Sequence, residues 1–101
     1  MLTSKQRSYV KSKAQHIKAT FQIGANELHE NNVRAIRETF NTKEILKIKV
    51  NRVNKEDKEI TRKMAEQIAK EVEAQVVGVI GTTIILYKQH KDKDMRMDIN
   101  G

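Results

Sequence analysis

The residues of this chain that could do chemistry are mainly lysines and arginines, and they are unevenly distributed along its 101 residues. Residues 1–55 contain twelve Lys or Arg and four Glu, residues 56–88 contain five basic and six acidic residues, and residues 89–101 contain three of each. The formal net charge of +7 therefore comes from the first half of the chain. A concentrated basic surface is typical of proteins that bind a polyanion such as a nucleic acid. The alternative is that the lysines only keep the protein soluble.

A turn expected at Gly24-Ala25-Asn26-Glu27 could bring backbone N–H groups close to a phosphate. It would precede a helix, and the positive end of a helix dipole attracts anions. Glycine lets a phosphate approach closely because it has no side chain, and nearby cations would add a salt-dependent attraction. The residues expected to contact nucleic acid are Arg7, Lys11, Lys18, Gly24, Ala25, Asn26, Arg34, Lys47 and Lys49.

The patterns typical of enzymes and metal sites are missing from the sequence. The chain has no Cys, which excludes disulfides and thiolate metal sites. His16, His29 and His90 have no partner at ligand spacing and are expected on the surface. There is no phosphate-binding loop of the nucleotide-hydrolase type, no dinucleotide fingerprint and no nucleophile elbow. We therefore expect a non-enzymatic protein with no metal, cofactor or small-molecule substrate.

Hydrophobic periodicity predicts three helices and four strands in the order αβαβαββ. Helices are expected over about residues 4–17, 30–40 and 54–73, where apolar residues recur every three or four positions. Strands are expected over residues 20–23, 44–51, 76–80 and 83–87, where apolar residues alternate or form short β-branched runs. Helical crossovers imply parallel pairing, and Gly81-Thr82 is expected to close an antiparallel hairpin. The predicted fold is α/β (of the α+β two-layer type), with a four-stranded mixed sheet packed with three helices.

The clearest strand, 44–51, is expected to have one core face and one exposed basic face. Its apolar residues Leu46, Ile48 and Val50 alternate with Lys47 and Lys49. Ile45 breaks this alternation and is expected near an edge of the sheet.

Two helix starts and one aromatic residue can also be predicted. Thr3 and Gln6 fit a capping box at the start of the first helix. Asn54 is expected to cap the third helix. Tyr9 is expected to be partly buried rather than free to stack on a base.

The chain is expected to form one domain over residues 1–88. Residues 89–101 show no periodicity and mixed charge, which predicts a flexible tail. The longest apolar stretch, 76–86, is too short to cross a membrane, and residues 1–5 lack the apolar run of a secretion signal. We therefore expect a cytoplasmic protein, and we expect it to be a monomer.

Four stretches of the sequence, in the same order and with nearly the same spacing, resemble the CRM domain family, named for chloroplast RNA splicing and ribosome maturation. The resemblance is closest to its small stand-alone bacterial YhbY-like members and covers about residues 2–88. The stretches are residues 2–7 (LTSKQR), 21–24 (FQIG), 44–50 (EILKIKV) and 79–88 (VIGTTIILYK). The resemblance implies the αβαβαββ fold, binding to ribosomal RNA and association with precursors of the large ribosomal subunit.

The family's RNA contact includes a Gly-x-x-Gly loop, similar to that of K-homology domains, which clamp the nucleotide backbone. The resemblance places this loop at Gly24-Ala25-Asn26-Glu27, where Glu27 replaces the second glycine and Ala25 replaces a common basic residue. His29 and Thr82 likewise replace a common Thr or Ser and a common Arg. The alternative to an RNA-binding protein is therefore a protein-interaction module of the same fold that has lost RNA binding.

Overall fold

The order of helices and strands confirms the predicted αβαβαββ arrangement. A computed structural model describes residues 2–54 and 56–99. The elements are α1 (Ser4–Ala14), β1 (Phe21–Gly24), α2 (Glu30–Thr39), β2 (Ile45–Asn51), α3 (Lys58–Val72), β3 (Gln75–Ile80), β4 (Thr83–Tyr87) and a short 3-10 helix, η1 (Lys93–Met95).

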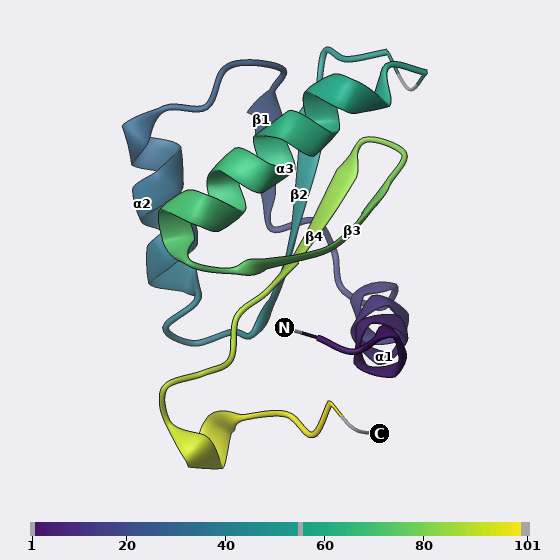
Figure 1. Cartoon of the computed structure of the whole chain (residues 1–101). Helices are drawn as coiled ribbons and strands as arrows, with labels where there is room; N and C mark the ends of the chain where they lie inside the picture. Colours follow the sequence, from purple (N-terminus) through teal and green to yellow (C-terminus); the bar gives the residue numbers. More distant parts are fainter. Residues whose placement is uncertain (1, 55, 100–101) are drawn as a thin grey trace.

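The four strands form one mixed sheet in the order β1-β2-β4-β3 (Figure 1). β1 and β2 are parallel, whereas β4 is antiparallel to both β2 and β3. The helix α2 makes the crossover that a parallel β1–β2 pair requires. Gly81, with φ of +59°, supplies the left-handed backbone that the tight β3–β4 hairpin needs. The predicted mixed sheet is confirmed.

Helices cover both faces of this sheet. The larger core cluster joins α2 and α3 to the sheet and includes Ile36, Leu46, Ile48, Ile68 and Ile84. A smaller cluster joins α1 to the opposite face and is formed by Leu2, Val10, Ala14, Ile45, Val77, Ile85 and Tyr87. The strands therefore lie between two helical layers, with α1 alone on one side (Figure 1).

The structure refines one expectation about β2 and corrects another. Ile45 pairs with Tyr87 of β4 but lies before the part of β2 that pairs with β1, which begins at Ile48, so it has a neighbouring strand on one side only; its side chain is nevertheless buried under α1. The face that carries Lys47 and Lys49 is only partly exposed, since α1 covers its Ile45 end. The alternation of β2 described one buried face correctly but gave no sign that a helix packs on the other.

The helix starts differ in how well local sequence predicted them. Thr3 and Gln6 form the expected capping box, in which the Gln6 N–H donates to Thr3 Oγ1 at 3.1 Å. The helix α1 ends at Ala14 rather than near residue 17. Asn54 does not cap α3: its Oδ1 accepts the Glu56 N–H in the preceding turn, and Asp57 takes the N-cap position.

Residues 89–99, which the sequence predicts to be a flexible tail, contact the domain through the buried Glu44. The Glu44 carboxylate accepts the N–H of His90 at 2.8 Å and the N–H of Met97. Met97 and Ile99 pack against the α1 cluster. His90 is buried rather than on the surface as expected; its Nδ1 accepts the Asp92 N–H at 2.9 Å while Nε2 faces the carbonyl oxygen of Asn41.

Candidate nucleic-acid interface

The exposed part of the α1-side sheet face carries two of the predicted cations. Lys47 and Lys49 project from β2 on the same side as Ile45, because alternate strand residues share a face. Lys47 lies opposite Ile85 on β4, and Ile85 lies opposite Gly78 on β3. One row further along, Lys49 lies between Gln22 of β1 and Thr83 of β4. Lys47 is half-buried and Lys49 is exposed, so the covering by α1 decreases along β2.

Gly78 brings Lys11 of α1 onto this same surface. A Cβ atom at Gly78 would lie 2.6 Å from Lys11 Cε and 3.2 Å from Nζ, so the Lys11 side chain occupies the space that any larger residue would fill. Gly78 and Lys47 are two strands apart, which places the Lys11 ammonium roughly 10 Å from the backbone of Lys47. The helix and the sheet therefore present their cations together.

Arg7 and Lys18 extend this surface along α1 and beyond its end. Arg7 precedes Lys11 by four residues and is exposed, so both lie on one side of the helix. Lys18 is exposed in the connection to β1, near Thr20, whose N–H donates to the Lys47 carbonyl at 2.8 Å. We call the surface formed by Arg7, Lys11, Lys18, Lys47 and Lys49 the basic face.

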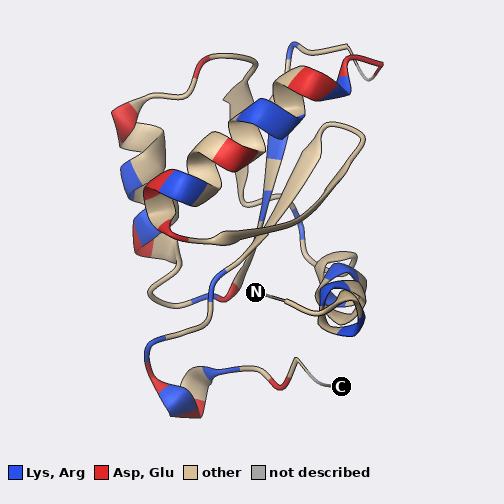
Figure 2. Cartoon of the chain, viewed as in Figure 1, with Lys and Arg blue, Asp and Glu red and all other residues tan. Residues whose placement is uncertain are grey.

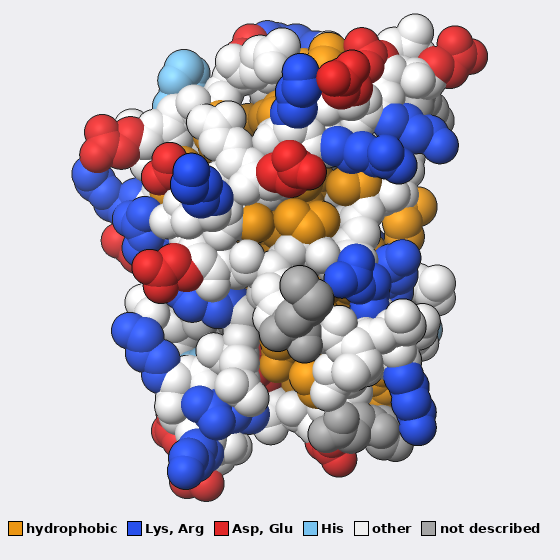
Figure 3. Space-filling model, in the orientation of Figure 1, with side chains coloured by type: hydrophobic (Ala, Val, Ile, Leu, Met, Phe, Trp, Pro, Cys, Tyr) orange, Lys and Arg blue, Asp and Glu red, His pale blue; other side chains and the backbone are white. Residues whose placement is uncertain are grey.

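The cations of the basic face have no carboxylate partner among the described residues. Across residues 2–54 and 56–99 the salt bridges are Arg52–Glu27 at 3.0 Å and Lys63–Glu59 at 3.3 Å. Figure 2 shows α1 with Lys and Arg but no acid, whereas α2 and α3 alternate both signs. The same mixture covers the α3 side in Figure 3. The charge asymmetry in the sequence thus becomes an asymmetry between the two sides of the sheet.

Tyr9 adds no free aromatic ring to this surface. It is half-buried, as expected, and the Lys13 ammonium lies 5.5 Å from its ring centroid. At this distance the ring face already makes a cation–π contact.

The Gly24 turn lies at the end of the sheet that is nearest to Lys49. The Ala25 N–H donates to the Asn51 carbonyl at 2.8 Å, and the Glu27 N–H donates to the Gly24 carbonyl at 2.9 Å. Asn26 has φ of +59°, a left-handed conformation that asparagine tolerates well. The turn is therefore fixed to the end of β2, beside the basic face.

Glu27 covers this turn with its own carboxylate. Its Oε2 lies within the space that a Cβ atom of Gly24 would occupy, and its Oε1 lies 3.0 Å from Nη1 of Arg52. The space that the missing side chain opens at Gly24 is thus filled by a negative charge. Arg52, which the sequence did not single out, balances that charge.

Arg34 is the one predicted cation that the structure places elsewhere. It lies on α2, on the opposite side of the sheet from α1. There it borders a hollow of about 430 Å³ with Leu28, His29, Glu30, Val33, Arg37, Gln67 and Glu71. Its neighbours include carboxylates, so it does not extend the acid-free basic face.

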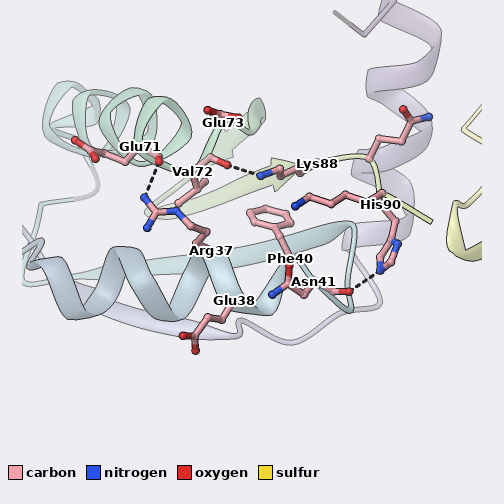
Figure 4. A pocket seen from close by; sticks show the side chains of 11 residues that line it. Arg37, Glu38, Phe40, Asn41, Glu71, Val72, Glu73, Lys88 and His90 are labelled. Carbon is pink, nitrogen blue, oxygen red and sulfur yellow. Dashed lines mark hydrogen bonds between the residues drawn. The ribbon is translucent and has the colours of Figure 1, made fainter. Parts of the chain in front are cut away.

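A second hollow on this side of the sheet has a structural explanation. It measures about 490 Å³ and lies between α2, the C-terminal end of α3 and residues 88–91 (Figure 4). Arg37 Nη2 donates to the Glu71 carbonyl and Lys88 Nζ donates to the Val72 carbonyl, both at 2.9 Å. These cations satisfy carbonyl groups that are left without partners at a helix C-terminus.

Residues 2–54 and 56–99 contain no group of three His, Cys, Asp or Glu side chains that could hold a metal ion. In the same residues, no helix is long and apolar enough to cross a membrane.

Comparison with known families gives residues 2–88 as a match to the family described as "CRS1 / YhbY (CRM) domain". The chain belongs to the CRM domain family. The match covers α1 to β4 and confirms the resemblance inferred from the four sequence stretches.

Individual CRM-family relatives match over nearly their whole length. A Bacillus subtilis protein named "Probable RNA-binding protein YqeI" is 37% identical over 92 residues, covering 91% of this chain and 93% of the relative. A Haemophilus influenzae "RNA-binding protein" is 27% identical over 96 residues, covering 95% of this chain and 94% of the relative. These names describe RNA binding rather than catalysis, in agreement with the non-enzymatic protein expected from the sequence.

A solved CRM-type structure confirms the fold. The solution structure of a Staphylococcus aureus protein, described as "a putative RNA binding protein", superposes with a TM-score of 0.77 at 33% identity. The superposition covers 97% of this chain and all of the other.

Sequence reasoning about this CRM domain missed Gly78 and Arg52. A glycine inside an apolar strand was the available signal for Gly78, since such a residue often marks a close approach. No local pattern pointed to Arg52, because its partner Glu27 is 25 residues away.

Proposed function

We propose that this CRM-family protein binds ribosomal RNA in precursors of the large ribosomal subunit and acts in ribosome assembly. The names of its relatives support RNA as the partner. The ribosomal target follows from the resemblance to the family. The observation that carries the proposal is the basic face, whose five cations have no carboxylate partner among the described residues.

The basic face is suited to contact a phosphate backbone. Each Lys or Arg that neutralises a phosphate releases counterions, so the affinity falls as salt rises. In a plot of the logarithm of the association constant against the logarithm of the salt concentration, each phosphate contact contributes a slope of about −0.7 to −0.9. Five contacts therefore give a slope no steeper than about −4.5. Recognition would depend mainly on the shape and backbone of the RNA, because Tyr9 is occupied by Lys13.

The test is charge reversal on the two sides of the sheet. The double variant Lys47→Glu/Lys49→Glu changes the basic face, and Arg62→Glu/Lys70→Glu makes the same change in net charge at exposed positions of α3. We expect the first pair to weaken binding of a large-subunit RNA fragment strongly and to flatten its salt dependence. The second pair should have only the small effect of altered net charge.

Equal losses in the two double variants would contradict a role for the basic face. The ribosomal target is tested separately by crosslinking the chain to RNA in cells and sequencing the bound fragments. Fragments from the large-subunit RNA are expected, and they should disappear in the Lys47→Glu/Lys49→Glu variant. Fragments spread evenly over cellular RNA would contradict the ribosomal assignment.

We propose that the protein acts as a monomer in the cytoplasm. Sedimentation of the free protein should give the mass of one chain, 11.7 kDa. A stable dimer would contradict this part of the proposal.

A second candidate function, a protein-interaction module without RNA binding, is favoured by the Glu27 carboxylate over Gly24. A pull-down that is unaffected by ribonuclease and recovers one protein without ribosomal RNA would support this second function.

A further inference from the structure

A small hollow lies within the basic face, beside Lys47. It has a volume of about 290 Å³ and is lined by Ala14, Gln15, Lys47, Ile80, Thr83 and Ile85. It therefore lies between the C-terminal end of α1 and the part of the sheet that α1 leaves uncovered.

The floor of this hollow is apolar and includes an unusually exposed side chain. Ala14 and Ile85 belong to the buried α1 cluster. Ile80 is 55% exposed, and among the described residues Met95 is the only other large hydrophobic side chain with comparable exposure. Ile80 sits at the end of β3, opposite Thr83. An exposed apolar group on a binding surface often marks a contact with a partner.

The rim of the hollow is polar. The Gln15 amide can donate and accept hydrogen bonds, the Thr83 hydroxyl can do both, and the Lys47 ammonium can donate. Neither the Gln15 amide nor the Thr83 hydroxyl is hydrogen-bonded to another side chain or to the backbone within the described part of the chain. An apolar floor with a few polar rim groups is the usual composition of a small-ligand site.

An unpaired nucleobase matches this combination of groups. Its flat face is apolar enough to lie on aliphatic side chains, and its edge carries the donors and acceptors that an amide and a hydroxyl recognise. The surrounding cations Lys11, Lys47 and Lys49 complement the phosphates of the same strand. Charge complementarity thus favours a nucleotide over an apolar segment of another protein.

We propose that this hollow binds one unpaired base of the bound RNA, with the base on Ile80 and its edge toward Gln15 and Thr83. The proposal rests on the RNA-binding function proposed above and adds a preference for single-stranded RNA. It makes Ile80 and Gln15 specificity-determining residues, separate from the lysines that hold the backbone.

The test compares the two exposed hydrophobic residues. Ile80→Ser alters the hollow, and Met95→Ser removes the matched side chain in η1, away from the basic face. The probes are a single-stranded RNA and a fully paired duplex of equal length. We expect Ile80→Ser to weaken binding of the single strand by about five- to tenfold, the size of one modest base contact. The affinity of the Ile80→Ser variant for the duplex, and the salt dependence of its RNA binding, should not change. Met95→Ser should not alter the binding of either probe.

A second measurement uses the RNA rather than the protein. A single strand in which each base in turn is replaced by an abasic nucleotide should lose affinity at one position for the wild type and at none for Ile80→Ser. The proposal is overturned if abasic replacement has no effect at any position. It is also overturned if Ile80→Ser weakens the binding of duplex and single strand equally, or if it changes the binding of neither probe.

The failure of this inference can be distinguished from that of the proposed function. Salt-dependent RNA binding that is insensitive to Ile80→Ser removes only the base site. A wild-type chain that binds neither probe at low salt removes the RNA-binding function as well.

Discussion

The Glu27 carboxylate lies over Gly24, and its Oε2 atom occupies the space where a side chain of residue 24 would begin. The same carboxylate pairs with Arg52 at 3.0 Å. Both partners are exposed, with 78% of the Arg52 side chain and 50% of the Glu27 side chain accessible to solvent. Such an exposed pair is worth at most about 1 kcal/mol, so an incoming phosphate could displace it at little cost.

Glu27→Gln is therefore expected to raise RNA affinity by a few-fold, because it removes a negative charge from the turn and leaves Arg52 free to meet a phosphate. The measurement is RNA binding at fixed salt. Glu30→Gln is the matched control, since Glu30 is exposed three residues away and has no ion pair among the described residues. An equal gain in both variants would show that only net charge matters.

Arg34→Ala should affect RNA binding much less than Lys49→Ala. Lys49 belongs to the basic face, whereas Arg34 lies on α2 near Glu30 and Glu71. Loss of one phosphate contact should reduce the magnitude of the salt slope by about 1, and we expect this change for Lys49→Ala alone. A larger change for Arg34→Ala would move the interface to the α2 side of the sheet.

The stability of the fold should decrease at high pH because of Tyr87. Burial raises the pKa of its hydroxyl above the ordinary value of 10.0, and the nearby Glu44 carboxylate raises it further, against a smaller lowering by Arg96. Below pH 10 the hydroxyl is neutral in both the folded and unfolded chains. Above that pH the unfolded chain ionises first, so the free energy of unfolding should fall as pH rises through the folded-state pKa.

Denaturant titrations between pH 8 and pH 11, as an order-of-magnitude window around the tyrosine pKa of about 10, test this dependence. Tyr87→Phe removes the ionisable group while keeping the ring, so the fall should be shallower in the variant. Parallel curves for the variant and the wild type would assign the loss of stability to other groups.

Glu44→Gln should release residues 89–99 from the domain. The carboxylate accepts the N–H groups of both His90 and Met97, and a glutamine would present an NH₂ group to one of them. A buried donor left without a partner costs about 1–3 kcal/mol. Hydrogen exchange should become faster in residues 89–99, while Glu38→Gln at an exposed site of α2 should leave it unchanged. Unaltered exchange in Glu44→Gln would show that other contacts hold this segment.

Residues 1–88 should still fold when residues 89–101 are removed. All seven major helices and strands lie before Lys88, but the truncation would uncover part of the α1 cluster against which Met97 and Ile99 pack. We therefore expect a native circular dichroism spectrum and a lower midpoint of thermal unfolding. An unfolded fragment would contradict the proposed domain boundary at residue 88.

The sequence alone was enough to determine the order of elements and the kind of surface that they would carry. The alternation of Leu46, Ile48 and Val50 and the four-residue repeat of α3 depend on short-range geometry, which a linear pattern records directly. The capping box at Thr3 is equally local. The charge imbalance between the two halves of the chain and the four family stretches led to the same class of function.

The tertiary structure alone decided which of these residues meet. Lys11 reaches β3 only because Gly78 leaves room, Glu27 pairs with Arg52 25 residues away, and Arg34 lies on the opposite side of the sheet from Lys47. Ile45 is buried because α1 packs on the second face of the sheet. These relationships depend on the strand order β1-β2-β4-β3 and on where α1 crosses it. They are long-range contacts, and no periodicity within a single helix or strand encodes them.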